Sequence, residues 1–404
     1  MSEISKENGC LNTTFGNTSD GSTLFNFINA INSIISVVGL GGNILVFYVI
    51  CRFSSMRTIT NIFIMALSLA DIAFLVNVPL LIVTAVLENW IFGDIYCKVY
   101  YVMTTVNQFA SSFLLVTMSA DRYFAVCQPV ISRKIRTPKK AILACCLVWF
   151  LAILLMCPVF LYSGTISKDD DVGGETNCNI VWPDFYEVQG PKVFALYCFV
   201  LGFALPVIFM FLFYGLVLKK LHIKQDNSAG LRKHPSGSVS TDDRRRLKFR
   251  RVSAVILVLM LAFLICWTPY WAYQIHITFL IDDTPITVDE FESCQLNATR
   301  EANIQQQIIY TALFLQCLCY ANSAINPILY SVLSRHFKQS YAKAWKCYTA
   351  GNRNRKHHTP NRIPRSPYAG HPIIDARTYL APPSPPLQLC VSRSSSGCRS
   401  EFFL

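Results

Sequence analysis

Apolar residues are gathered along this chain in seven long runs that short polar segments separate. Each run holds about 20 or more residues, the length that an α-helix needs to cross the hydrocarbon core of a membrane. Several runs exceed that length, so we expect tilted helices. The runs are residues 25–51, 59–87, 97–127, 141–162, 192–218, 252–281 and 305–332. The pattern predicts an all-α membrane protein, a seven-transmembrane helix bundle whose two ends lie on opposite sides of the membrane.

Composition and charge agree with this class. Of the 404 residues, 52% are hydrophobic and 15% are charged, whereas a soluble domain holds about 25% charged residues. The formal net charge is +12, and Lys and Arg concentrate after the first, third and fifth runs. The positive-inside rule places those segments in the cytoplasm, so the basic balance does not indicate nucleic-acid binding. The N-terminus is then extracellular, and we expect a multi-pass protein of the plasma membrane whose first run acts as the insertion signal.

Glycan acceptors and cysteines fit the same orientation. Three Asn-X-Ser/Thr triplets all lie on the predicted outer side, and such triplets accept N-linked glycans. They begin at Asn12, Asn17 and Asn297. Four of the 16 cysteines also face outward, where oxidising conditions permit pairing. A bridge between Cys97, at the start of the third run, and Cys178 would pin the segment before the fifth run over the bundle. Cys10 and Cys294 would form the remaining pair.

Every apolar run also contains polar or helix-breaking residues. A single proline inside a membrane usually marks a kink, and a single asparagine usually bonds two helices. An ionisable side chain at such depth is a functional hypothesis by default, which applies to Asp71. The other residues are Asn43, Asn107, Ser111, the DRY sequence at 121–123, Trp149, Pro158, Pro206, Tyr214, the CWTP sequence at 266–269, Asn322, Asn326, Pro327 and Tyr330.

These residues resemble those of the rhodopsin-type, class A G-protein-coupled receptors, over residues 25 to 347. Asn43, the SLAD sequence ending in Asp71, WIFGDIYC ending in Cys97, DRY, Trp149, Pro206, CWTP and NPILY carry the resemblance. In such receptors the matching polar cluster holds an allosteric sodium ion, and oxygen ligands suit a hard cation. The resemblance therefore implies a sodium site, with passive hydrogen-bonded packing as the alternative and no other cofactor. Its ligands would be Asp71, Asn107, Ser111, Asn322 and Asn326.

The resemblance also implies a conformational switch and a coupling site. Trp267 matches the ligand-sensing residue of the family, although an aromatic residue at helical spacing can also be simple core packing. The other switch residues would be Phe263, Pro269, Pro206, Tyr214, Asn326, Pro327 and Tyr330. Arg122, with Asp121 and Tyr123, would meet the G protein. The start of the sixth run reads LKFRRVSA and has no carboxylate, so we expect Asp121 and polar contacts alone to hold Arg122.

The outer halves of the runs narrow the class of ligand. Amine receptors use a carboxylate in the third run where this chain has Thr104, and opsins need a lysine that residues 305–332 lack. An acidic rim with aromatic residues suits a cationic peptide, since it raises the association rate. The chain is similar to the somatostatin, opioid and allatostatin C receptor group, and Thr104 favours the allatostatin C branch. Expected ligand-binding residues are Thr104, Gln108, Gln274, Gln316, Trp271 and Tyr273.

The segments outside the bundle complete the predicted organisation. Residues 1–24 form a glycosylated extracellular arm, and residues 25–333 form the receptor bundle. Residues 334–347 form an amphipathic eighth helix on the inner leaflet, so they contact membrane lipid, with Cys347 as a palmitoylation site. Residues 348–404 are rich in proline and basic residues, which predicts a disordered cytoplasmic tail. Its serine cluster at 392–400 would dock arrestin once phosphorylated.

We therefore expect a receptor for an extracellular, allatostatin C-like neuropeptide that activates a heterotrimeric G protein of the Gi/o class. One alternative is a somatostatin- or opioid-like peptide receptor. A membrane transporter or channel is the alternative from another class, although the chain shows no internal duplication. Walker and HExxH motifs are absent from the sequence, which argues against an enzyme.

Overall fold

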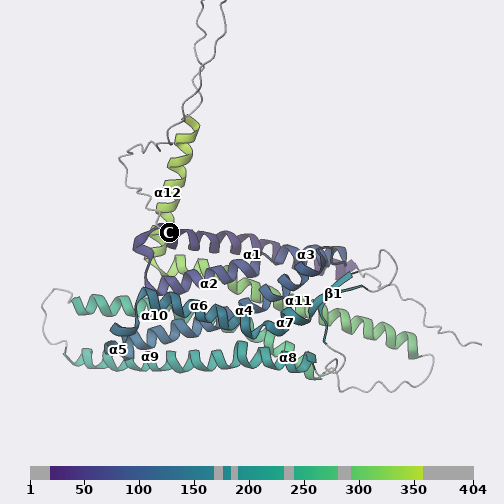
Figure 1. Ribbon diagram of the computed structural model, residues 1–404. Helices are drawn as coiled ribbons and strands as arrows, with labels where there is room; N and C mark the ends of the chain where they lie inside the picture. The colour runs from purple at the N-terminus through teal and green to yellow at the C-terminus, as the bar shows by residue number, and fades with distance from the viewer. Residues whose placement is uncertain (1–18, 168–175, 183–189, 232–240, 281–292, 358–404) are drawn as a thin grey trace, which may run out of the picture. The chain divides into compact units, whose positions relative to one another are not determined.

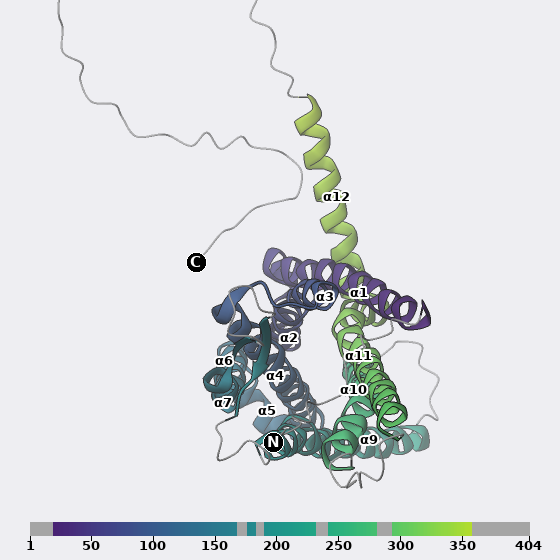
Figure 2. The same cartoon turned by 90° about the vertical axis from the view of Figure 1, so that its right-hand side faces the viewer.

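Long helices lying side by side make up almost all of the structure (Figure 1). This computed structural model describes residues 19–167, 176–182, 190–231, 241–280 and 293–357. The bundle belongs to the unit that ends at Ser340, and the residues from Tyr341 onward form a second unit. A view along the helices shows those of the bundle arranged around a common axis (Figure 2). The predicted all-α, seven-helix fold is confirmed.

Each predicted run corresponds to one helix or to a broken helix. In chain order these are α1 (Ser19–Arg52), α2 (Ile59–Leu75) with α3 (Val78–Leu87), α4 (Gly93–Cys127), α6 (Pro138–Leu155) with α7 (Cys157–Tyr162), α8 (Gly190–Phe199) with the π turn η3 (Val200–Ala204) and α9 (Leu205–Leu231), α10 (Thr241–Leu280), and α11 (Ser293–Leu333). Short helices η1 (Ser54–Met56) and α5 (Pro129–Ile135) connect the runs, and α12 (Arg335–His357) follows them.

Three runs are interrupted, and a proline follows each interruption. Proline lacks the N–H that would continue the helix, and its ring clashes with the carbonyl four residues earlier. The breaks fall at Asn77 before Pro79, at Met156 before Pro158, and in the π turn before Pro206. The predicted run 59–87 is confirmed as one apolar span, Ile59–Leu87, within which the helix is broken for this reason. Pro269 and Pro327, in contrast, lie inside the continuous helices α10 and α11.

Several helices run past the predicted ends of the apolar runs. The seventh begins at Ser293 rather than at 305, so Asn297 lies on a helix and not in a loop as expected. Helix α12 continues to His357, beyond the predicted end at 347 and into the segment predicted to be disordered. Hydropathy detects where a helix lies in lipid, whereas helix formers such as Ala, Glu, Gln and Lys extend it into water. The apolar pattern therefore underestimates helix length.

A two-stranded antiparallel hairpin covers one end of the bundle. Strand β1 (Ser163–Ser167) pairs with β2 (Thr176–Ile180), and Thr165 lies opposite Cys178. The predicted bridge is present: Cys97 at the start of α4 and Cys178 on β2 are joined, with Cα atoms 5.6 Å apart. Apolar sequence alone did not predict these strands, because five-residue polar strands carry no hydropathy signal. Cys10 and the sites at Asn12 and Asn17 lie outside the described residues.

The outside of the bundle is apolar, as expected of a protein solvated by lipid, and polar side chains are buried among apolar ones in its interior. Helix α6 exposes large apolar side chains such as Leu143 at 59% and Phe150 at 64%. Within the part of the chain that the structure describes, six segments are long and apolar enough by themselves to cross a membrane, and α4 is not among them. Helix α4 instead buries polar residues, including Asn107 and Ser111, because it packs against α2, α6, α9 and α10. The least apolar span is thus at the centre of the bundle.

A glycine permits a close approach between α1 and α11. A Cβ atom added to Gly42 would lie 2.9 Å from the Cβ and Cγ atoms of Pro327, whereas a Cβ added to Gly41 would meet nothing within 4 Å. The proline ring is rigid, so the two helices would have to separate. Because Gly42 lacks a side chain, the kinked part of α11 can lie directly against α1.

We expect Gly42→Ala to destabilise the receptor by about 1–3 kcal/mol, the usual effect of overpacking. Thermal unfolding of the purified protein measures this change. Gly41→Ala is the matched control, and it should be neutral or slightly stabilising because alanine favours helix by about 1 kcal/mol over glycine. Equal effects of the two substitutions would contradict the assigned contact.

Candidate functional site

A cluster of buried polar side chains from three helices occupies the middle of the bundle. Asp71 comes from α2, Asn107 and Ser111 from α4, and Asn322 and Asn326 from α11, and none is more than 4% exposed. Asn326 Nδ2 donates to Asp71 Oδ2 at 2.9 Å, and Ser111 Oγ donates to Asn107 Oδ1 at 3.2 Å. These hydrogen bonds form two separate pairs, and all five side chains are buried in the interior rather than exposed to lipid.

Two oxygens of this cluster remain without a hydrogen-bond partner among the described residues. They are Oδ1 of Asp71 and Oδ1 of Asn322, and both are buried. A buried polar atom without a partner costs about 1–3 kcal/mol, and more if the group is charged. Because both atoms are acceptors, they would bond a cation or water. These oxygen atoms therefore fit a hard cation such as sodium, which prefers oxygen ligands.

Asn43 on α1 compensates for the proline in α11. The ring of Pro327 prevents the usual helical bond to the carbonyl four residues earlier, which belongs to Ser323. Asn43 Nδ2 donates to the Ser323 carbonyl oxygen at 2.9 Å and to that of Gly39, also at 2.9 Å. A side chain from a neighbouring helix thus satisfies the freed carbonyl, which is how proline is tolerated within a membrane. Asn43 therefore supplies the hydrogen bond that the backbone of α11 loses at Pro327.

An aromatic stack connects α10 with the π turn. The rings of Phe263 and Trp267 have centroids 6.0 Å apart, and Phe203 lies 6.0 Å from Phe263. Trp267 also contacts Tyr270 at 5.8 Å, and Tyr270 contacts Trp271 at 5.5 Å. Sequence reasoning missed Phe203, and it assigned Tyr270, which directly follows the CWTP sequence, to the aromatic residues of the ligand rim and not to the switch. The predicted switch residue therefore lies inside a continuous stack.

Most of the other predicted switch residues are buried in the bundle, whereas Pro269 is half-buried. Pro206, Tyr214, Pro327 and Tyr330 all lie in the interior. Tyr330 stacks on Phe337 of α12, with ring centroids 5.5 Å apart. The end of α11 and the first turn of α12 are therefore packed together, so a rotation of one would be felt by the other.

The six predicted ligand-binding residues come from α4, α10 and α11, and the side chains of two of them bond within their own helix. Thr104 Oγ1 donates to the Tyr100 carbonyl at 2.8 Å, and Gln316 Nε2 donates to the Tyr320 hydroxyl at 3.0 Å. Tyr273 instead joins two helices, since its hydroxyl donates to the Ile308 carbonyl at 3.1 Å. Gln274 is half-buried.

Gln108 and Trp271 differ from the other candidates, because each buries a donor without a hydrogen-bond partner among the described residues. These donors are Gln108 Nε2 and Trp271 Nε1. Gln108 lies against the π turn, where a Cβ on Gly202 would be 3.1 Å from its Nε2. Trp271 is 3% exposed and packs on Phe199, with ring centroids 5.7 Å apart. A ligand that supplies acceptors would satisfy both groups.

The DRY sequence forms a network of ion pairs and hydrogen bonds at the other end of α4. Arg122 pairs with Asp121, and its Nη2 also donates to Thr60 Oγ1 at 2.7 Å. Arg136, just after α5, donates to Asp121 from Nε at 2.6 Å and from Nη2 at 3.1 Å. Tyr123 points elsewhere and stacks with Phe213, at 5.7 Å between centroids. Asp121 thus holds two arginines.

Thr60 and Arg136 were not predicted. Arg136 lies fifteen residues after Asp121, just past the end of the separate short helix α5, so no helical spacing links the two residues. Its only signal in the sequence is a basic residue near the end of a predicted cytoplasmic segment. In agreement with expectation, the described contacts of Arg122 involve Asp121 and a hydroxyl.

Comparison with known proteins identifies a family that has these features. Residues 42–330 match the family named 7 transmembrane receptor (rhodopsin family). Somatostatin receptor type 2 of Mus musculus is 33% identical over 309 residues, which are 76% of this chain and 74% of that receptor. Somatostatin receptor type 5 of Bos taurus is 32% identical over 322 residues, 79% of this chain and 76% of that receptor. Somatostatin receptor type 1 of Rattus norvegicus is 31% identical over 329 residues, which are 81% of this chain and 74% of that receptor.

The match covers all of the motifs from Asn43 to Tyr330. It excludes the alternative of a transporter or channel, and it confirms the expectation that the protein is not an enzyme, because members of this family are signalling receptors. The protein is a multi-pass membrane protein, and the chain belongs to the rhodopsin-like, class A family of G-protein-coupled receptors.

Proposed function

We propose that this protein is a plasma-membrane receptor for an extracellular peptide and that it activates a heterotrimeric G protein of the Gi/o class. The peptide would be allatostatin C-like. The observation that carries the ligand class is Thr104, whose hydroxyl bonds the Tyr100 carbonyl at a position where amine receptors have a carboxylate. The somatostatin receptors among its relatives support a peptide ligand.

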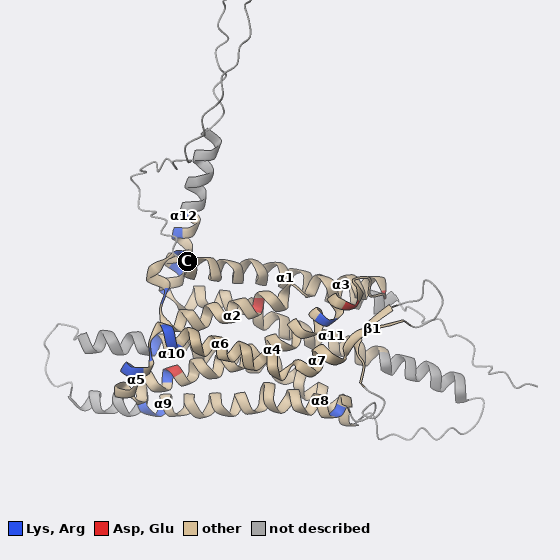
Figure 3. Cartoon of the chain, viewed as in Figure 1, with Lys and Arg blue, Asp and Glu red and all other residues tan. Residues whose placement is uncertain are grey.

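The proposed orientation rests on the distribution of charge. Lys and Arg of the described residues gather at the end of the bundle where α5 lies, with Lys219 and Lys220 on α9 and Arg250 and Arg251 on α10 (Figure 3). The hairpin lies at the opposite end. By the positive-inside rule, the basic end faces the cytoplasm. The disulfide-linked hairpin and the N-terminal arm would then be extracellular.

The mechanism follows from the order of features along the bundle. A peptide that supplies acceptors to Gln108 and Trp271 would bind one arrangement of the aromatic stack better than another, and that difference in affinity shifts the population of states. The stack leads to the kinked part of α11 and from there to Tyr330. Movement of these helices would release Arg122 from Asp121 and Thr60, so that it can contact the G protein. Phosphorylation of the tail would then permit arrestin binding, and palmitoylation of Cys347 would attach α12 to lipid.

A peptide-library screen with nucleotide exchange as the readout tests this function. We expect allatostatin C-like cyclic peptides to activate the receptor, and peptides that depend on a lysine, such as somatostatin, to be weak. Thr104→Asp should reverse that preference, because it places a carboxylate where a cationic side chain would be bound. If somatostatin- or opioid-like peptides activate the unmodified receptor more strongly, the second candidate, which the somatostatin receptor relatives favour, is correct.

We also propose that Asp71, Asn107, Ser111, Asn322 and Asn326 hold a sodium ion. When bound, the ion would supply positive charge to the buried oxygens that lack partners, Oδ1 of Asp71 and Oδ1 of Asn322. Binding to one state of the receptor stabilises that state by mass action.

Asp71→Asn should abolish both the effect of sodium on agonist affinity and the rise in melting temperature that sodium gives to the ligand-free receptor. The melting measurement requires no G protein. Ser68→Ala is the matched control, because Ser68 is buried one turn earlier on α2 and bonds only its own helix, at the Ile64 carbonyl. Sodium sensitivity that survives in Asp71→Asn would exclude the site.

A further inference from the structure

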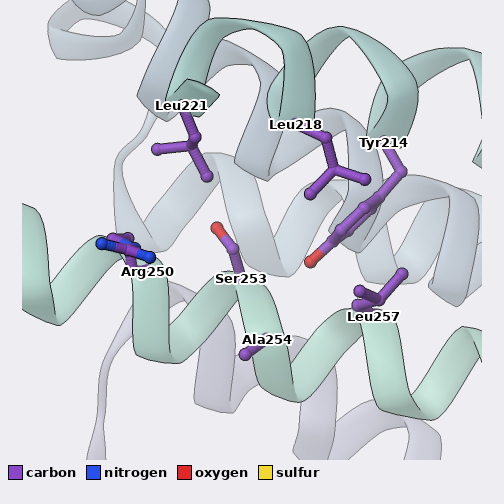
Figure 4. A pocket seen from close by; sticks show the side chains of 7 residues that line it. All are labelled: Tyr214, Leu218, Leu221, Arg250, Ser253, Ala254 and Leu257. Carbon is purple, nitrogen blue, oxygen red and sulfur yellow. The ribbon is translucent and has the colours of Figure 1, made fainter. Parts of the chain in front are cut away.

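A cavity of about 430 Å³ lies between α9 and α10 at the basic end of the bundle. Tyr214, Leu218 and Leu221 of α9 line one side, and Arg250, Ser253, Ala254 and Leu257 of α10 line the other (Figure 4). Its volume is within the range of about 300–1,000 Å³ that is typical of small-molecule sites. The proposed ligand-binding and sodium residues do not line it.

The lining changes in character along the length of the cavity. The helices run in opposite directions, so Leu221 lies near Arg250 at one end, and Tyr214 lies near Leu257 at the other (Figure 4). The two ends are separated by seven residues on each helix, or about 10 Å at 1.5 Å per residue. One end is therefore charged, and the other is apolar apart from a phenol.

Two hydroxyl groups lie between these ends. Tyr214 is 2% exposed and Ser253 is 3% exposed. Both hydroxyls point into the space between the helices, and neither forms a hydrogen bond with the described residues (Figure 4). Buried hydroxyls of this kind normally have a partner. A ligand with acceptor oxygens at this level would provide one.

The cavity crosses the boundary between membrane and water. Residues 193–218 and 252–280 contain no Asp, Glu, Lys or Arg. Charge begins immediately beyond them, at Lys219 and Lys220 on α9 and at Arg251 and Arg250 on α10. The Arg250 end is thus at the level of lipid headgroups, and the Tyr214 end is at the level of acyl chains. Leu218 and Ala254 are exposed on the surface of the bundle, so the cavity is open to lipid.

We propose that this cavity is a binding site for a membrane phospholipid with an anionic headgroup. The phosphate lies at Arg250, the ester oxygens accept from the hydroxyls of Ser253 and Tyr214, and an acyl chain runs along Leu218 and Leu257. The basic sequence RRRLKFRR at 244–251 adds attraction for anionic lipid. A soluble phosphate would leave the apolar half of the cavity unused. The assignment to the cytoplasmic leaflet depends on the proposed orientation, but the binding itself does not.

The test uses the full-length receptor in a non-ionic detergent, with phosphatidylserine and phosphatidylcholine of identical acyl chains as probes. We expect phosphatidylserine to raise the melting temperature and to be retained in native mass spectrometry, and phosphatidylcholine to do neither. Arg250→Gln should weaken retention about fivefold, equivalent to about 1 kcal/mol for a basic residue at a membrane surface. Ala254→Phe should abolish it by filling the cavity.

Matched controls are Arg251→Gln and Leu261→Phe. Arg251 is exposed beside Arg250, and Leu261 is 45% exposed further along α10, and neither lines the cavity. Both variants should retain the lipid as the unmodified receptor does. The proposal would be overturned if the two lipids bound equally, or if inorganic phosphate raised the melting temperature as much as phosphatidylserine does. It would also be overturned if Arg251→Gln lost as much lipid retention as Arg250→Gln, or if Ala254→Phe retained the lipid normally. None of these outcomes bears on the peptide or on the G protein, so the proposed function is tested separately.

Discussion

Replacing Arg122 with alanine is expected to abolish agonist-stimulated nucleotide exchange while peptide binding persists. The guanidinium group is 3% exposed and is held by Asp121 and Thr60. It is the cationic group that movement of the helices could present to a G protein, and alanine offers neither charge nor donors. Peptide affinity measured without G protein should change only slightly. The change should be smaller than the change in affinity of about 5- to 150-fold that is typical of coupling between two sites.

The neighbouring carboxylate provides a test in the opposite direction. Asp121→Asn removes the charge that pairs with both Arg122 and Arg136, so basal nucleotide exchange should rise. Arg133→Ala is the control, because Arg133 is an exposed residue of α5 without a described ion pair to Asp121. Removing one partner of a buried pair costs about 3–5 kcal/mol, so surface expression must be measured for every variant. Normal exchange in Arg122→Ala at equal expression would contradict the assigned role.

Loss of the bridge between Cys97 and Cys178 is expected to have the second large effect, the loss of peptide binding. The bridge joins β2 to the start of α4 and so fixes the hairpin over the end of the bundle where the peptide enters. Packing and hydrogen bonds to the hairpin would remain, and among them Asp94 Oδ1 accepts from the Thr165 amide at 3.0 Å and Asn89 Oδ1 accepts from the Thr176 amide at 2.9 Å. Such bonds contribute about 0.5–1.5 kcal/mol each, less than the about 2–5 kcal/mol measured for disulfides in small secreted domains.

The variants are Cys97→Ser and the double variant Cys97→Ser with Cys178→Ser, in which neither cysteine of the bridge is left as an unpaired thiol. Radioligand binding and surface labelling should both fall in each. Cys146→Ser controls for the loss of a cysteine as such, since Cys146 is free and exposed on α6. If the double variant bound peptide and reached the surface like the unmodified receptor, the bridge would have no role in shaping the site.

Individual residues show how far the sequence predicts the site and where it stops. The prolines at 158 and 206 indicated irregular helices, because the missing N–H is a property of the residue itself. The break at Asn77 was missed inside an unbroken apolar run. Asp71 and Asn326 could be assigned to one cluster only through resemblance, since 255 residues separate them and only packing brings them within 2.9 Å. Arg136 and Thr60 had no signal that linked them to the DRY sequence.

The sequence by itself determined the membrane class, the seven helices and the family. Hydropathy and motif residues are local properties, which act through the surrounding lipid and the backbone of the same segment. Only the tertiary structure showed that Asn43 satisfies the carbonyl which Pro327 frees in α11, and that Asp121 holds two arginines from different elements. It also showed that two buried hydroxyls face a cavity between α9 and α10. These features depend on which helices become neighbours and how each is rotated, and periodicity along one helix does not specify either.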